Sequence, residues 1–278
     1  MDDRPDSLPL GDSDTAGRLA QARAALRGLD RTADAGLSDA GRRAPLQVLA
    51  PMALVRGRVH ELAGSARQVL AVLAAAAAAR EGGAVLWLRP GWRAETLCPA
   101  GMRALAGGDT ALLEALIIAD APREGDILWS MEEALRAGCV ALVVGEVGTA
   151  PDLRQIRRLH LAAAEGAARA GSGSRADSGA GSGSGAPLGL LLAQDRADSR
   201  IAGVESRWGF QALPPEMPPE MPSETHPDPA APFAAHRDNG PRWRLTRLRA
   251  RDAPPADWVI DPSALPRPKA LTQSATPV

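Results

Sequence analysis

Hydrophobic positions along this chain gather in short runs that alternate with longer, helix-like stretches. A branched run at 58–62 comes first, and three continuous apolar runs of strand length follow at 84–88, 139–147 and 188–194. Continuous apolar runs of this length suit strands that are buried on both faces of a parallel sheet. Helix-like stretches lie between them, at 66–80, 95–106, 125–138 and 152–170.

The alternation of strands and helices predicts an α/β protein with a mainly parallel sheet flanked by helices. Three later segments, "SRWGFQAL", "PRWRLTRLRARD" and "DWVID", predict antiparallel strands that finish the sheet at the C-terminal end. Gly138 is expected to stop one helix, and Asp152 to cap the next. Residues 112–118 fit a helix or a strand, so their assignment stays open.

Changes in composition divide the chain into a lead-in, a core and a tail. The lead-in, 1–45, comprises a disordered start, a helix at 15–29 and a linker; the core is expected over 46–261, and 262–278 is expected to be a disordered tail. Two flexible inserts are expected in the core, a Gly/Ser-rich one at 171–187 and another at 214–240 that is proline-rich over 214–232. The predicted N-terminal helix carries an apolar stripe, which could pack on its own domain or on a partner, made by Leu19, Ala22, Leu26 and Leu29.

Composition narrows the choice of compartment and partner. Hydrophobic residues make up 45% of the 278 residues, enough for a core, and the net charge of −1 steers neither nucleic acid nor membrane strongly. Residues 1–14 are acidic, unlike a signal peptide, and the apolar run at 69–79 is shorter than the roughly 20 residues of a membrane helix. Cys98 and Cys139 are expected to be reduced, buried thiols, without the closely spaced ligands of a zinc site. We therefore expect a cytoplasmic protein that binds no membrane and no metal.

The stretch "GRVHELAGSARQVLAVL", at 57–73, has the strand–turn–helix layout of a nucleotide-binding loop. The Walker A pattern needs a second glycine and a lysine, but Gly64 is followed by Ser65 and Arg67, and the only lysine of the chain is Lys269. Arg67 could reach an anion at the helix N-terminus, or it could be a solvated first-turn arginine. The phosphate-loop position is therefore interpreted as degenerate, which means that it keeps the layout of the loop without the residues that bind phosphate.

The position of the second ATPase motif is degenerate as well. The strand that should end in a magnesium-binding aspartate ends in "LVVGEV", with Gly145 at the aspartate position. Glu146 is one residue further and should point to the opposite side of the strand, as a helix-capping or surface group. Because both halves of the ATP chemistry are missing, we expect no nucleotide cofactor and no catalytic residue.

Other enzyme patterns fit less well. His60 and Glu61 begin a zinc-protease motif, but Gly64 stands where its second histidine should be. Glu132 and Glu133 are adjacent on a predicted helix, so they should face apart, which suits a solvated face better than acid–base catalysis.

A basic cluster near the C-terminal end of the core is a candidate for nucleic-acid binding. Its members are five arginines and a tryptophan on one predicted strand: Arg242, Trp243, Arg244, Arg247, Arg249 and Arg251. Guanidinium groups could contact a phosphate backbone while the indole ring stacks on a base. The alternative is a solvated edge strand whose charges prevent pairing with another sheet.

The order of these motifs resembles the core of the RecA-type recombinases. "GRVHEL", the helix after it and "GGAVLWL" resemble the first βαβ unit, "APREGDILWSMEEALRAGCVALVVGEV" the next helix and strand, and "LGLLLAQ" the strand after that. The chain over 46–261 resembles the ImuA family in particular. It lacks the phosphate-loop residues, contains "WSMEEALRAG" and has a late "RW…PRWR" segment.

This resemblance implies an accessory protein without turnover in SOS-induced, error-prone translesion DNA synthesis. The implied partners are an ImuB-like protein, which is a catalytically inactive relative of the Y-family polymerases, and an error-prone DNA polymerase. RecA and single-stranded DNA are further partners that stay open, and recruitment would bring the protein to the nucleoid. No catalytic residue carries over, because 64–69 and Gly145 depart from the ATP-binding pattern. The alternatives are a degenerate RecA-like ATPase and a single-strand DNA-binding protein.

Overall fold

The computed structural model describes residues 44–172, 186–193, 201–214, 242–261 and 265. The chain divides into two units, Met1–Arg42 and Arg43–Val278. The first unit lies outside the described residues, and with it the helix predicted at 15–29 and its stripe of Leu19, Ala22, Leu26 and Leu29. Most of the two predicted inserts and of the predicted tail also lies outside.

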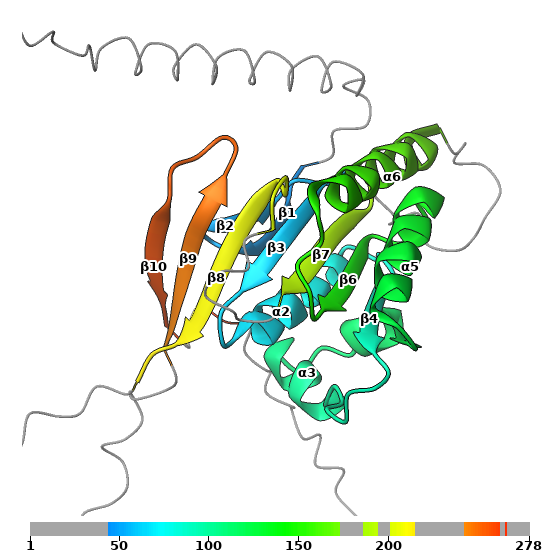
Figure 1. The fold of residues 1–278 in the computed structure, drawn as a ribbon. Helices are drawn as coiled ribbons and strands as arrows, with labels where there is room; N and C mark the ends of the chain where they lie inside the picture. Colours follow the sequence, from blue (N-terminus) through cyan, green and yellow to red (C-terminus); the bar gives the residue numbers. More distant parts are fainter. Residues whose placement is uncertain (1–43, 173–185, 194–200, 215–241, 262–264, 266–278) are drawn as a thin grey trace, which may run out of the picture. The chain divides into compact units, whose positions relative to one another are not determined.

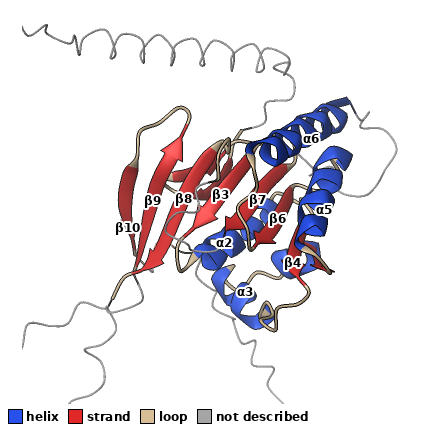
Figure 2. Cartoon of the chain, in the orientation of Figure 1, coloured by secondary structure: helices blue, strands red, loops and turns tan. Residues whose placement is uncertain are grey.

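The second unit is an α/β structure built on an eight-stranded mixed sheet (Figures 1 and 2). The sheet has the order β10-β9-β8-β3-β7-β6-β4-β5. Its strands are β3 (Val59–Ala63), β4 (Val85–Pro90), β5 (Leu116–Ala121), β6 (Leu142–Val147), β7 (Leu188–Ala193), β8 (Ser206–Ala212), β9 (Trp243–Ala250) and β10 (Ala256–Ile260). All neighbouring pairs from β8 to β5 are parallel, and β9 and β10 are added antiparallel. The predicted fold class is confirmed.

One face of the sheet is covered by α2 (Arg67–Arg80), with α3 (Pro99–Leu105) and α4 (Ala111–Ala115) beside it. Every residue of α2 from Leu70 to Ala79 is buried. A helix that is apolar all round needs cover on its outer side as well. A two-stranded hairpin of β1 (Leu46–Leu49) and β2 (Met52–Leu54) belongs to the same hydrophobic cluster and provides part of that cover.

The other face carries α5 (Glu124–Ala137) and α6 (Leu153–Ser172), packed side by side (Figure 1). Both are amphipathic and bury residues such as Ile127, Met131 and Ile156 in a second hydrophobic cluster. Their ends follow the sequence prediction. Gly138 takes a left-handed conformation at the end of α5, with φ 69°. Asp152 and Gln155 form a reciprocal capping box at the start of α6, each side chain accepting the other's backbone N–H at 2.8 Å.

Several boundaries differ from those predicted. The hairpin β1–β2 lies just where the core was expected to begin, but the short runs LQVL and MAL carry little periodic signal. The ambiguous stretch 112–118 is divided between α4 and β5, and β6 begins at Leu142 rather than at residue 139. Leu265, within the stretch predicted as a disordered tail, packs against the hydrophobic cluster on the α2 face.

No helix in the part of the chain that the structure describes is long and apolar enough to cross a membrane. Over the same residues, no three His, Cys, Asp or Glu side chains come together in a way that could hold a metal ion.

Candidate functional site at the carboxyl ends of the strands

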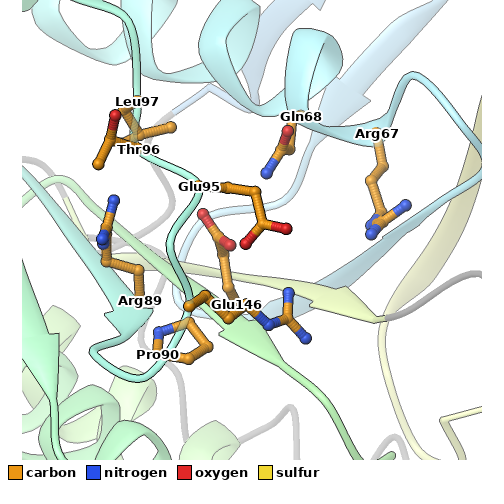
Figure 3. Close-up of a pocket in the computed structure, with 9 residues that line it drawn as sticks. Arg67, Gln68, Arg89, Pro90, Glu95, Thr96, Leu97 and Glu146 are labelled. Atoms are coloured by element: carbon orange, nitrogen blue, oxygen red, sulfur yellow. The ribbon is translucent and has the colours of Figure 1, made fainter.

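A pocket of about 220 Å³ opens at the carboxyl ends of β4 and β6, beside the first turn of α2 (Figure 3). The connection that follows β4 runs over the α2 face of the sheet, whereas the one that follows β6 runs over the α5–α6 face. Adjacent parallel strands whose connections leave on opposite faces create the crevice where open α/β sheets bind ligands. The pocket is therefore the candidate functional site that the topology itself favours.

The degenerate phosphate-loop position borders this pocket. Gly64 lies between β3 and α2 with φ +94°, and a Cβ at this position would collide with the carbonyl oxygen of Phe210 on β8. The backbone N–H of Ala66 donates to that same oxygen at 3.0 Å. Gly64 is therefore required for the close approach of β8 and for the left-handed backbone, both of which are structural needs.

The other two residues of the degenerate phosphate-loop position, Arg67 and Ser65, differ in their surroundings. Arg67 lines the pocket, and its side chain donates to the carbonyl oxygen of Gly64 at 3.1 Å, while its backbone N–H reaches the same oxygen at 3.2 Å. Ser65 is exposed. The first turn of α2 has Ala66 at its N-cap, which makes no side-chain cap. Arg67 is thus half-buried and hydrogen-bonded to the turn. It is neither a fully solvated arginine nor one whose side chain is unbound and available to an anion.

Gly145 and Glu146 lie on opposite sides of β6, as the strand geometry predicted. A Cβ on Gly145 would meet the sulfur of Met131 in α5, whereas Glu146 lines the pocket on the α2 side. Glu146 was expected to be a surface or capping group, and this is wrong. Its side chain is buried and accepts a hydrogen bond from the indole N–H of Trp87 at 2.8 Å. The bond links β6 to β4, which are neighbours in the sheet.

Charged side chains of both signs line the pocket, and the carboxylates of Glu95 and Glu146 point into it (Figure 3). Arg89 is buried against Asp120, with Nε 2.6 Å from a carboxylate oxygen. Arg93 and Glu95 form no ion pair with any residue that the structure describes. Because Asp120 balances Arg89, the remaining two arginines, Arg67 and Arg93, are matched by two glutamates and the pocket has no positive excess. The volume is below the roughly 300 Å³ at which ligand pockets usually begin.

The basic cluster on β9 does not form one surface. Cross-strand partners share a face of the sheet, and Arg244 pairs with Gln211 while Arg249 pairs with Arg207. Arg244 and Arg249 are therefore exposed together on one face of β9. Arg251 lies in the following turn, with Nε 3.5 Å from a carboxylate oxygen of Glu205.

Two further members of the cluster, Arg247 and Trp243, lie on the opposite face of β9. Arg247 lies over the rings of Trp208 and Trp258, 5.8 and 5.3 Å from their centres. Trp243 is half-buried and stacks on Phe210. Arg242 precedes the strand and is half-buried. The alternative of a solvated edge strand is wrong, because β9 lies between β8 and β10.

Ionisable residues on and beside β3 are buried, away from the pocket. Burial lowers the pKa of His60 to about 4, and its two ring nitrogens contact Ser206 Oγ at 2.7 Å and the carbonyl oxygen of Val55 at 2.9 Å. Burial raises the pKa of Glu61 to about 7, although the Arg207 guanidinium 3.2 Å away works in the opposite direction. His60 and Glu61 are thus structural residues of the sheet, as the missing second histidine suggested.

Two further predictions need correction. Cys98 and Cys139 are free, but both are exposed rather than buried. Cys98 is the N-cap of α3, and its sulfur accepts the backbone N–H of Gly101 at 3.4 Å. Glu133 is exposed as expected, but Glu132 is buried, with its two carboxylate oxygens 2.5 and 2.6 Å from Arg136 and Arg158.

Sequence reasoning missed the pocket residues Arg89, Arg93 and Glu95. They lie at or just beyond the end of an apolar run that was correctly identified as a strand. The position itself was the available signal, because residues that follow a parallel strand lie at the ligand-binding edge of the sheet.

No protein-family model matches the chain, and no curated protein matches it either.

Proposed function

We propose that this chain is an accessory protein of the ImuA type, without turnover of its own, in SOS-induced, error-prone translesion DNA synthesis. The observation that carries the proposal is that the backbone N–H groups at the phosphate-loop position are already hydrogen-bonded within the protein. The N–H of Ala66 donates to Phe210 and that of Arg67 to Gly64, so neither points freely at a phosphate. In a working phosphate loop such N–H groups cradle the anion. A RecA-like arrangement that holds no nucleotide is suited to docking other proteins.

The proposed partners are those implied by the resemblance: an ImuB-like protein and an error-prone DNA polymerase, with RecA and single-stranded DNA as further partners. The protein would act in the cytoplasm and gather at the nucleoid when it is recruited. The stripe at 15–29 and the tail from Pro262 are the segments proposed to dock, since amphipathic or flexible segments can fold on a partner.

A pull-down with purified ImuB-like protein tests this role. The full chain should retain the partner, and a Leu19→Asp/Leu26→Asp variant should retain much less, because a buried carboxylate is unfavourable in an apolar interface. Arg27→Asp, on the same predicted helix and on the side away from the stripe, is the matched control. Equal retention by all three proteins would show that the stripe is not the docking segment, and no retention by any of them would contradict the adapter role.

A second function, residual nucleotide binding, is favoured by one observation: the arginine-lined pocket lies at the topological switch point. Titration of a fluorescent ATP analogue with magnesium separates the two functions. We expect no saturable binding, because the pocket is small and two carboxylates line it together with the arginines. Saturable micromolar binding that is lost in Arg93→Ala, and kept in Arg103→Ala away from the pocket, would establish the ATPase alternative instead.

A further inference from the structure

Helices α5 and α6 expose three large apolar side chains, of which Leu153, the first residue of α6, is the least exposed. Trp129 on α5 is 62% exposed and Leu161 on α6 is 70% exposed. Tryptophan is costly to leave in water and is enriched among the residues that dominate protein interfaces. Trp92 is also exposed, at 53%, but it does not line the pocket at the ends of β4 and β6.

A hollow of about 130 Å³ lies beside Trp129, between the two helices. Leu128 and Leu159 contribute apolar walls, and Gln155, Arg158 and Glu132 contribute polar ones, with Glu132 paired to Arg136 and Arg158. The hollow is open at Gly125, one turn before Trp129, where an added Cβ would meet nothing within 4 Å. A cavity of about 150 Å³ is enough to hold a benzene ring. The hollow can therefore take one branched aliphatic side chain or a small ring.

Among the residues that the structure describes, the carboxylates near this hollow are all engaged, and the charged groups left without a partner are positive. Glu124 accepts the backbone N–H of Thr149, and Asp152 accepts that of Gln155. On α5, Asp126 is paired with Arg123, and Glu132 and Glu133 with Arg136. On α6, by contrast, Arg154 and Arg157 are exposed and form no ion pair with any residue that the structure describes.

Helical spacing places these charges next to the apolar groups. Arg154, Arg158 and Leu161 follow one another at i, i+4 and i+7, so they form one ridge along α6. Arg158 both lines the hollow and contacts Glu132 of α5. We call the surface formed by Trp129, Arg154, Arg157, Arg158, Leu161 and the hollow the α5–α6 surface.

We infer that the α5–α6 surface binds an acidic peptide segment of a partner protein, with one large apolar side chain seated in the hollow beside Trp129. The apolar anchor supplies affinity, and the Asp and Glu residues around it meet Arg154 and Arg157. A nucleic acid fits less well, because the unpaired cations cover little more than one helical turn, whereas a nucleic-acid backbone spreads its charge over a longer path. The inference rests on this surface alone and holds whether or not the role in translesion synthesis is right.

Selection of short random peptides displayed on phage against the full-length protein tests the inference. The enriched peptides should carry several Asp or Glu residues around a large aliphatic or aromatic residue. A fluorescent enriched peptide should then bind saturably and bind less tightly as salt is added. Trp129→Ala and Arg154→Glu/Arg157→Glu should each weaken its binding at least about tenfold. Trp92→Ala and Arg244→Glu/Arg249→Glu are the matched controls and should leave it unchanged.

Four results would overturn the inference. The first is a selection that yields no enrichment, or enrichment without acidic residues. The second is binding of the enriched peptide that survives Trp129→Ala. The third is tighter binding of oligothymidylate than of the peptide, with Trp129→Ala abolishing it, which would make the surface a nucleic-acid site. The fourth is a dimer in sedimentation analysis that Trp129→Ala dissociates, which would show that a second copy covers the surface. The altered residues are exposed, so unchanged circular dichroism is expected for every variant.

Discussion

At the scale of single residues, burial keeps the histidine of β3 neutral, and its neighbours fix which ring nitrogen carries the proton. The indole N–H of Trp208 donates to Ser206 Oγ at 2.9 Å, which leaves the hydroxyl free to donate to His60 Nδ1. Nε2–H of the same ring donates to the carbonyl oxygen of Val55. The hydrogen bond to Val55 favours the protonated ring, but burial outweighs it and lowers the pKa of His60 to about 4.

The first prediction concerns His160 on α6, whose ring Nε2 lies 3.0 Å from the carbonyl oxygen of Gly203 and whose pKa burial also lowers to about 4. The unfolded chain binds this proton below about pH 6.5 while the folded chain stays neutral, so stability falls as the pH drops from there towards 4. In urea unfolding over a pH series, His160→Leu should lose less stability across that window than the wild type, by up to about 3 kcal/mol. Parallel curves for the two proteins would show that the pKa of His160 is the same in the folded and unfolded states, which would contradict the lowered value.

Glu61 should act in the opposite direction. Its pKa in the folded state is about 7 against a usual value of 4.5, so the folded state holds a proton that the unfolded state has lost. Its contribution to stability is therefore lost as the pH rises from about 4.5 to 7. Glu61→Gln should remove this loss, so that unfolding measured at pH 5 and at pH 8 differs from the wild type mainly at the higher pH. An equal effect at both pH values would contradict the raised pKa.

At the scale of elements, the turn from β3 to α2 keeps the outline of a nucleotide loop for reasons of packing. Gly64→Ala should destabilise the protein by about 1–3 kcal/mol, because φ is positive there and the new Cβ collides with β8. Gly125→Ala is the control, since its Cβ would meet nothing within 4 Å and alanine favours a helix by up to about 1 kcal/mol. Thermal unfolding of both variants measures the difference. A Gly64→Ala variant as stable as Gly125→Ala would mean that the turn can move away from β8.

The strand β9 offers only two of its arginines to a nucleic acid. If the chain binds single-stranded DNA through β9, Arg244→Gln/Arg249→Gln should lower the slope of log affinity against log salt by about 1.4, or 0.7 for each phosphate contact. Arg247→Gln should leave the slope unchanged and lower the stability, because Arg247 stacks on two tryptophans and donates to the carbonyl oxygen of Pro254 at 2.8 Å. Fluorescence anisotropy with oligothymidylate gives the slopes. An equal loss of slope in both variants would contradict the two-faced arrangement of β9.

The sequence predicted elements best where one local pattern was enough. The apolar runs that became β4, β6 and β7 are buried on both faces, so their composition alone indicated a strand. The stretch at 112–118 could not be assigned, because Leu and Ile fit a helix and an edge strand equally well. The pairing of Glu146 with Trp87 and the burial of Glu61 could not be read at all, since both depend on residues brought together only by the sheet. The location of the pocket, at the carboxyl ends of neighbouring strands, could therefore be predicted from the sequence, whereas the residues that line it could not.

At the scale of the whole molecule, the two edges of the sheet that the structure describes differ. β5 exposes Ile117 and Ile118 at 53% and 45%, whereas β10 exposes Val259 beside Asp257 and Asp261. An exposed apolar edge strand is a template for pairing with another chain. Ile118→Lys should therefore reduce light scattering on heating more than Val259→Lys, although each adds one positive charge. Equal protection by both would mean that net charge, and not the β5 edge, controls association.

The spread of the tryptophans over this fold also gives the protein its own optical probes. The chain has six tryptophans and no tyrosine, so its near-ultraviolet emission comes almost wholly from indole rings. Trp87 and Trp208 are buried and Trp243 and Trp258 are half-buried, whereas Trp92 and Trp129 face the solvent. A water-soluble quencher should therefore reach the last two first, and with Trp92 replaced by phenylalanine the quenchable emission would come mainly from Trp129. Binding at the α5–α6 surface could then be followed in the unlabelled protein, because the ligand would shield the indole ring of Trp129 from collisions with the quencher.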